Sequence, residues 1–359
     1  LAAGGLAAGL LSRALPDRAI AAGVGSNLVA SGVGLLGALV TLVAGASQTA
    51  VLPWSVPMGT LALRLDPLSA FFLVPTLLVS ALAALYGRGY LAGKSPSSWL
   101  WFNWMVASLV GVLLSADGLV FLISWEIMSV TSFLLVVLED HRPEVRRAGQ
   151  TYLVATHIGT AFLFALFLLV APGGDSLAFP KAGSLAPSLA GVAFLLGLVG
   201  FGTKAGFVPA HVWLPEAHPA APSHVSAFLS GVILKSGVYG LVRVLTWAQA
   251  PADWWGWTLV FVGLASGVLG VVFALAQHDL KRLLAYHSVE NLGIISLGLG
   301  LGLLGLSGGS PLAAALGFGG ALLHVWNHAW FKSLLFLGAG AVGKATGSLN
   351  VEGMGGLLR

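Results

Sequence analysis

Long apolar runs, separated by short polar or Pro- and Gly-rich stretches, make up most of the chain. Most runs are about 17–25 residues long, which is the length that a helix needs to cross a ~30 Å hydrocarbon core. The first run, 1–11, reaches only about 16 Å in a helix, and we expect it to be the end of a truncated helix. Ten further runs predict full membrane helices, at 24–45, 66–87, 99–115, 118–138, 147–170, 189–213, 223–247, 254–277, 282–305 and 313–342.

These elements predict an all-α, polytopic transmembrane bundle of about ten full helices and an N-terminal stub. Composition supports it, because 57% of residues are hydrophobic and 8% are charged, whereas soluble domains carry about 25% charged residues. The net charge of +4 is explained by basic loops of a membrane protein, so we expect no nucleic-acid partner. The absence of cysteine excludes thiolate-bound zinc and Cys-ligated iron–sulfur clusters in this chain. We expect this chain to hold no cofactor, and we expect any redox chemistry to take place in a partner protein.

Lysine and arginine are concentrated in alternate loops. Loops after odd-numbered segments, with 1–11 as the first, hold eleven of them, and loops after even-numbered segments hold three. Basic residues collect on the cytoplasmic side, so we expect a bacterial inner-membrane protein whose odd-numbered loops are cytoplasmic. The eleven are Arg13, Arg18, Arg88, Lys94, Arg142, Arg146, Arg147, Lys281, Arg282, Lys344 and Arg359, and the three are Arg64, Lys181 and Arg243.

Four charged residues are expected at membrane depth within the apolar runs, namely Glu126, Lys204, Lys235 and Lys332. Each costs about 2.5–3.5 kcal/mol at the centre of a membrane helix. One interpretation is an ion pair between Glu126 and a lysine that only joins two helices. The lysines outnumber the glutamate, however, and amines without a full counter-charge can take up and release protons. The set therefore indicates a proton relay.

The segment that follows Lys204 is interrupted by prolines at 209, 215, 219 and 222. Backbone groups that such breaks leave free are tolerated at membrane depth only where they face protein or a wet cavity. We expect Lys204 to lie beside an unwound, hydrated stretch, with a structural proline kink as the alternative.

His324, His328 and Lys332 are four residues apart and share one helical face. Two histidines at this spacing can bind zinc, but no further ligand is evident nearby. We therefore expect no metal and interpret both histidines as relay groups, because histidine titrates near physiological pH.

Other motifs are weaker. His157 and His287 suit either a relay or ordinary packing, and an access path is expected along His211, His218 and His224. The G-x-G-x-x-G run at 338–343 follows no strand, so close helix packing explains it better than a dinucleotide site.

A weak internal repeat joins two predicted helices. Glu126 follows a serine by two residues and precedes another by six, and Glu290 does the same. The two helices are five segments apart and cross in opposite directions, as in an inverted-topology repeat. Glu290 is then the counterpart of Glu126. We expect peripheral N-terminal helices at 1–98, a first five-helix repeat at 99–250 and an incomplete second repeat at 251–359.

Two segments resemble the antiporter-like membrane subunits, a family that includes proton-pumping subunits of respiratory complex I, Mrp-type cation/proton antiporters and membrane-bound hydrogenases. They are GTKAGFVPAHVWLPEAHPAAPSHVSA at 202–227 and HVWNHAWFKSLLFLGAG at 324–340. The stretches 216–224 and 280–291 are most similar to the hydrogenase-4 component B and formate hydrogenlyase subunit 3 branch. The resemblance implies that Glu126 pairs with Lys204, that Lys235 is a relay group, and that Lys332 begins a second half-channel whose outlet lies beyond this chain.

The leading hypothesis is a proton-translocating subunit, without a redox centre, of a respiratory hydrogenase or NADH:quinone oxidoreductase-type complex. Its partners would be other membrane subunits, the lipid bilayer and protons, with Na⁺ as the alternative ion. The competing hypotheses are a Na⁺/H⁺ or K⁺/H⁺ antiporter subunit and a non-pumping membrane scaffold of a hydrogenase.

Overall fold

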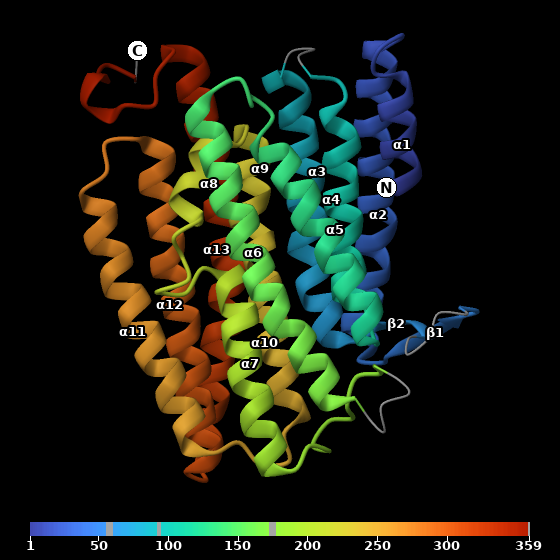
Figure 1. The fold of residues 1–359 in the computed structure, drawn as a ribbon, viewed down its shortest axis with the longest axis vertical. Helices are drawn as coiled ribbons and strands as arrows, with labels where there is room; N and C mark the ends of the chain where they lie inside the picture. The colour runs from blue at the N-terminus through green and yellow to red at the C-terminus, as the bar shows by residue number, and fades with distance from the viewer. Residues whose placement is uncertain (55–59, 92–94, 172–176, 358–359) are drawn as a thin grey trace.

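The computed structural model describes residues 1–54, 60–91, 95–171 and 177–357, and it is a bundle of helices that run along its long axis (Figure 1). Two basic residues counted in the orientation argument, Lys94 and Arg359, lie outside this part of the chain. The predicted all-α polytopic fold is confirmed.

Within the described residues, eight helices are long and apolar enough to cross a membrane. The other two predicted segments, 99–115 and 313–342, are also helical. They lie in the 17-residue helix Ser98–Leu114 and the 36-residue helix Pro311–Thr346. The eight are α2 (Pro16–Ala44), α3 (Pro67–Leu91), α5 (Gly118–Val136), α6 (Pro143–Val170), α7 (Pro187–Ala205), the continuous helix Ser223–Trp247, α11 (Asp253–Leu275) and α12 (Leu280–Ser307). The remaining helical elements are α1 (Ala2–Leu11), α4 (Ser98–Leu114), α8 (Leu214–Ala220), α13 (Pro311–Thr346) and a short 3₁₀ turn at Val351–Gly353.

The helix Ser223–Trp247 forms the centre of the bundle. Its most apolar window is 94% buried, whereas the windows of α2 and α11 are 22% and 28% buried. It consists of α9 (Ser223–Phe228), a π-helical turn η1 (Leu229–Ile233) and α10 (Leu234–Trp247). A π-helical turn inside an α-helix is rare and is frequent at functional sites.

Two local features differ from the prediction. The helix expected at 189–213 ends at Ala205, because Gly206 adopts a left-handed conformation with φ of +83° that favours glycine. In addition, an antiparallel hairpin pairs β1 (Gln48–Leu52) with β2 (Leu61–Leu65), with Gln48 opposite Leu65. Figure 1 shows the hairpin projecting beside one end of the bundle. The sequence analysis treated this segment as a loop.

Glycine allows the helices to approach closely. A methyl group added at Gly293 of α12 would lie 2.5 Å from the backbone nitrogen of Gly267 on α11. Gly340, in the G-x-G-x-x-G run, packs against Ser223, where an added methyl group would lie 2.4 Å from the serine Cβ. Small residues at such contacts let helix backbones pack tightly in a membrane, which agrees with the packing interpretation of that run.

A buried ion pair joins three helices at the end of the bundle that carries the hairpin. Arg243, near the end of α10, donates to both oxygens of Asp66 at 2.6 and 2.5 Å, and to Ser69 at 2.8 Å. Its Nε donates to Tyr239, whose hydroxyl donates to the carbonyl of Leu113 on α4. Burial alone would raise the pKa of the Asp66 carboxyl, but the hydrogen bonds and charge of Arg243 hold it below its ordinary value of 3.8. Arg243, which the sequence analysis assigned to a loop, instead connects helices.

We predict that Asp66→Asn destabilises the folded protein by about 3–5 kcal/mol, because it leaves a buried guanidinium without its counter-charge. The lowered pKa of Asp66 means that the pair stabilises the fold fully above the unfolded-state value of 3.8. This stabilisation is lost as the pH falls through the folded-state value. Thermal unfolding in detergent at neutral and acidic pH measures both effects.

The control for this experiment is Glu139→Gln, which breaks an ion pair with Arg142 whose side chains are 57% and 50% exposed. Such exposed pairs contribute about 0–1 kcal/mol. Equal shifts in the unfolding temperature for the two variants would contradict the structural role of Asp66.

Candidate functional site

Lys204 lies in the last turn of α7, directly before the helix ends at Gly206. Gly206 has a φ of +83°, a backbone conformation in which other residues are strained, so this turn favours glycine. The backbone then continues without regular helix to α8, and Trp213 donates its Nε1 to the carbonyl of Thr203 at 2.9 Å. The expected break therefore lies immediately beyond Lys204.

The amine of Lys204 is enclosed by neutral groups. It is 2% exposed, and its Nζ donates to the Ser129 hydroxyl and the Tyr152 hydroxyl, both at 3.1 Å. It also lies over the rings of Trp125 and Tyr152, at 5.5 and 5.3 Å from their centroids. Aromatic faces attract cations, so this cage from α5 and α6 can hold an ammonium without a carboxylate.

Glu126 does not contact this amine. Its Oε2 lies 3.3 Å from His157 Nε2 on α6, and its Oε1 is buried without a hydrogen-bond partner among the described residues. Glu126, the expected partner of Lys204, is thus paired with His157 in this structure. Glu126 lies one helical turn before Ser129 on α5.

Lys235 lies beside the π-helical turn. Its Nζ donates to the carbonyl of Ser230 at 2.6 Å, five residues earlier in the same helix. A π-helical turn shifts the backbone hydrogen-bond ladder by one residue, which makes such a carbonyl accessible to a side chain. The same amine contacts Nδ1 of His328 on α13. Both side chains are almost fully buried, at 3% and 0% exposure.

The histidine contacts continue from His328. The rings of His324 and His328 are 6.3 Å apart, and Nε2 of His324 lies 2.9 Å from the Asn291 side-chain oxygen on α12. Nε2 of His328 is buried without a partner among the described residues. Lys235, His328, His324 and Asn291 therefore form a row of polar groups across three helices.

No ion pair between Lys332 and Glu290 forms among the described residues. Lys332 is 1% exposed and donates to the carbonyl of Leu284 at 2.8 Å. Glu290 accepts from or donates to Nδ1 of His287 at 2.5 Å, on its own helix, and their side chains are 23% and 36% exposed. Both glutamates singled out by the repeat are thus paired with histidines rather than with lysines.

Two buried groups were missed by the sequence analysis. Lys281 was counted among loop residues, yet it is 3% exposed and donates to the carbonyl of Ala221 at 2.7 Å. It lies beside Arg282 in a basic doublet, and nothing in that doublet distinguishes it. His218 was assigned to an access path, but it is completely buried, and both ring nitrogens lack partners in the described chain.

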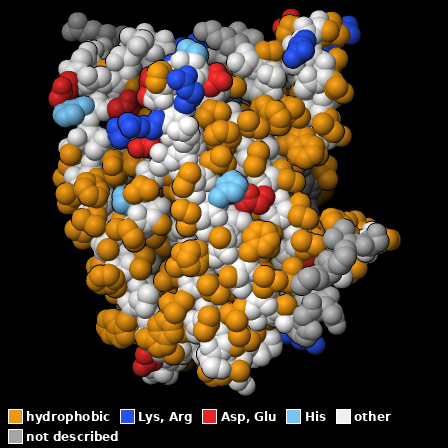
Figure 2. Space-filling model, viewed as in Figure 1, with side chains coloured by type: hydrophobic (Ala, Val, Ile, Leu, Met, Phe, Trp, Pro, Cys, Tyr) orange, Lys and Arg blue, Asp and Glu red, His pale blue; other side chains and the backbone are white. Residues whose placement is uncertain are grey.

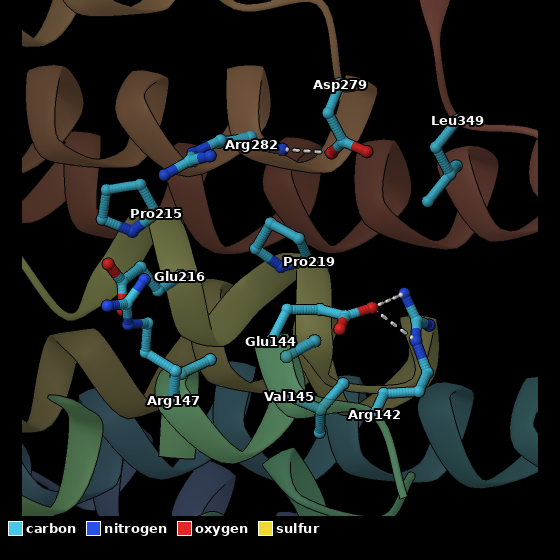
Figure 3. Close-up of a pocket in the computed structure, with 12 residues that line it drawn as sticks. Arg142, Glu144, Val145, Arg147, Pro215, Glu216, Pro219, Asp279, Arg282 and Leu349 are labelled. Atoms are coloured by element: carbon cyan, nitrogen blue, oxygen red, sulfur yellow. Dashed lines mark hydrogen bonds and ion pairs between the residues drawn. The ribbon is translucent and has the colours of Figure 1, made fainter. Parts of the chain in front are cut away.

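A charged cavity of about 440 Å³ opens at one end of the bundle, where α6, α8 and α12 meet. Figure 3 shows acidic and arginine side chains around it, with Glu144 bonded to Arg142. Oε2 of Glu216 is buried there without a hydrogen-bond partner among the described residues. The polar and charged lining residues are Arg142, Glu144, Arg147, Glu216, Asp279 and Arg282.

Across the residues that the structure describes, no three His, Asp or Glu side chains gather in a way that could hold a metal ion. The amines, imidazoles, hydroxyls and carboxylates of the site can form hydrogen bonds and exchange protons.

Comparison with known proteins identifies the family of the chain. The family described as NADH:quinone oxidoreductase/Mrp antiporter, TM, matches residues 115–359. Hydrogenase-4 component B of Escherichia coli is 39% identical over 343 residues, which are 93% of this chain and 51% of that protein. Formate hydrogenlyase subunit 3 of the same organism is 34% identical over 334 residues, 90% of this chain and 54% of that protein.

The structural comparison gives the same result. A chain of the Mrp complex from Dietzia sp. superposes with a TM-score of 0.83 at 28% identity, covering 99% of this chain and 38% of that one. The chain spans about half the length of the curated relatives it matches. The resemblance inferred from the two signature segments is confirmed, and the chain belongs to the NADH:quinone oxidoreductase/Mrp antiporter family of antiporter-like membrane subunits.

Proposed function

We propose that the chain translocates protons as a subunit of a respiratory hydrogenase or NADH:quinone oxidoreductase-type complex. It contributes no redox centre, and its partners are other membrane subunits that supply the driving force. It lies in the inner membrane of a bacterium, with its odd-numbered loops in the cytoplasm. The segment 99–250 acts as a first repeat unit, flanked by the peripheral helices of 1–98 and followed by part of a second unit in 251–359.

One observation carries this proposal. Among the described residues, the amines of Lys204, Lys235 and Lys332 contact hydroxyl, carbonyl and imidazole groups, and none contacts a carboxylate. Burying an ammonium without a counter-charge costs several kcal/mol. A lysine that releases and regains its proton avoids that cost for part of each cycle. Such a lysine is a proton carrier rather than a structural ion-pair partner.

The contacts support a route for the proton. The charged cavity between α6, α8 and α12 provides access from the cytoplasmic end. Lys204 receives the proton, Glu126 controls its release, and Lys235 takes it up next. The His328–His324–Asn291 row then carries it across the bundle, with Lys332 and Glu290 serving the second unit.

Cation/proton antiport is the second candidate, because the matched family and the superposed structure include Mrp proteins. Buried lysines repel Na⁺ and K⁺, and this disfavours a cation path through the same groups. A proton flux that requires Na⁺ or K⁺ would support antiport. A membrane scaffold without transport would show assembly defects but unchanged proton flux when the lysines are replaced.

We predict that Lys204→Ala and Glu126→Gln each reduce proton transport, by about 100-fold or more for the lysine, the usual cost of losing a positioned proton-transfer group. The measurement is acidification of proteoliposomes that contain the intact complex. Lys181→Ala, which removes an exposed loop lysine, is the control and should transport normally. Normal transport by both site variants would refute the proposed function.

A second prediction concerns the lysine–histidine contact. His328→Gln keeps a hydrogen-bonding side chain but cannot carry a proton, so transport should fall by about 100-fold while the complex still assembles. His278 is the control, because it pairs with Glu352 at 2.8 Å and both side chains are more than 65% exposed. If His328→Gln and His278→Gln transport equally, the proton does not pass through His328.

A further inference from the structure

The seam between α3 and α13 holds two cavities. The larger, of about 510 Å³, lies near the ends of both helices, between residues 85–90 of α3 and 341–345 of α13. The smaller, of about 100 Å³, lies between residues 79–83 and 330–337, and Ala227 of α9 also lines it. Both cavities are thus formed mainly by the same two helices, away from the groups of the proposed proton route.

Hydrogen bonds at two levels show that α3 and α13 run parallel along this seam. Trp326 donates to the carbonyl of Phe71 at 3.2 Å, and Lys344 donates to the carbonyl of Gly89 at 2.9 Å. Each bond joins residues 255 positions apart in the sequence, so the two helices advance in step. The smaller cavity therefore continues the larger one toward the middle of the bundle.

The larger cavity offers a positive charge and hydroxyl groups. Lys344 is the one charged side chain among the described residues that line it, whereas arginines and carboxylates are equal in number around the cavity between α6, α8 and α12. An ammonium has three hydrogens, and the contact with Gly89 uses one of them. The rings of Tyr86 and Tyr90 stack at 5.4 Å, and the Tyr90 hydroxyl accepts a hydrogen bond from Ser223 at 3.4 Å, so it can donate its own hydrogen to a ligand. These donors suit an anion such as a phosphate group.

Beyond this cavity the seam presents an apolar surface. Leu82 of α3 and Leu334 of α13 are 54% and 70% exposed. Gly338 lies between the two cavities, about one turn from both Leu334 and Ala341 of α13. A methyl group added at Gly338 would meet no atom within 4 Å, so the glycine leaves room on the surface between the cavities.

The dimensions of the seam match one leaflet of a bilayer. Lys344 follows Leu334 by ten residues of α13, a rise of about 15 Å, and a leaflet is half of the ~30 Å hydrocarbon core. Figure 2 shows most lysine and arginine side chains of the visible face toward the end of the bundle where the charged cavity opens, next to a predominantly apolar surface. Lys344 is at that end, because Leu349, just after α13, lines the charged cavity. The amine is therefore at the level of the lipid headgroups, and the leucines are at the level of the acyl chains.

We propose that the α3–α13 seam binds one anionic phospholipid. Its phosphate contacts the Lys344 ammonium and the Tyr90 hydroxyl, and one acyl chain follows the seam past Gly338 to Leu334. An apolar helix of another protein would leave Lys344 without a counter-charge, and a free phosphate would leave the apolar part of the seam empty. Because Tyr90 contacts Ser223 at the start of α9, the bound lipid holds α3 and α13 beside the start of the most buried helix. The proposal does not depend on the proposed proton route.

Photo-labelling of the intact, membrane-embedded complex tests the binding. A trace of phosphatidylglycerol with a diazirine in its acyl chain is activated, and mass spectrometry should map adducts to 79–90 and 330–345. Unlabelled phosphatidylglycerol should remove these adducts. Phosphatidylcholine should compete about fivefold less well, which is the preference for anionic lipid that one lysine near the surface supplies, and inorganic phosphate should have no effect. A seam without adducts, or equal competition by phosphatidylcholine or inorganic phosphate, would overturn the proposal.

Two variants separate the headgroup contact from the acyl-chain contact. Lys344→Gln should weaken the labelling by phosphatidylglycerol about fivefold, whereas Lys181→Gln, which removes an exposed loop lysine, should not. Gly338→Leu keeps every charge but fills the seam, so it should abolish the adducts at the smaller cavity. Its control is Gly32→Leu on α2, where an added methyl group also meets no atom within 4 Å.

The glycine variants decide the question even if Lys344→Gln fails to assemble. Loss of the adducts in Gly338→Leu, with normal labelling of Gly32→Leu, would support an acyl chain in the seam. If both variants are labelled like the unmodified protein, no acyl chain lies there, and the proposal is wrong.

Discussion

The arrangement of this molecule depends on the burial of lysine amines that have no carboxylate partners among the described residues. Each amine must be satisfied by polar groups that an apolar bundle does not ordinarily offer, since unmet hydrogen bonds in this environment are costly. Lys204 uses a hydroxyl, a phenol and two aromatic faces. Lys235 uses a carbonyl beside a π-helical turn and an imidazole. Lys332 and Lys281 each use a backbone carbonyl.

These requirements explain the irregular backbone at the centre of the bundle. α7 ends at a left-handed glycine directly after Lys204, and the most buried helix contains a π-helical turn directly before Lys235. Both irregularities lie inside protein rather than against lipid, which is where a membrane tolerates them. The ion pair of Asp66 and Arg243 lies at the opposite end of α10 from Lys235, so the paired charges that stabilise the bundle are separated from the unpaired amine.

The sequence predicted the helices well because apolar length is a strong signal, and it identified Lys204, Lys235 and Lys332 because charge within an apolar run is conspicuous. It could not predict which groups meet. Glu126 and His157 are on different helices, and their pairing depends on how α5 and α6 are rotated against each other. Lys281 was missed because a lysine next to Arg282 at a helix start is typical of a basic loop, and only packing against Ala221 buries it. The π-helical turn has no sequence signature that distinguishes it from an ordinary apolar helix.

The central claim is that the buried lysines change their protonation state. Solid-state NMR of the lysine side-chain nitrogens, in the membrane-embedded complex, distinguishes ammonium from neutral amine. Lys204 and Lys235 should each show both forms during turnover, and the exposed loop lysine Lys181 is the control. If Lys204 and Lys235 remain fully charged throughout turnover, they are structural cations, and they do not carry protons.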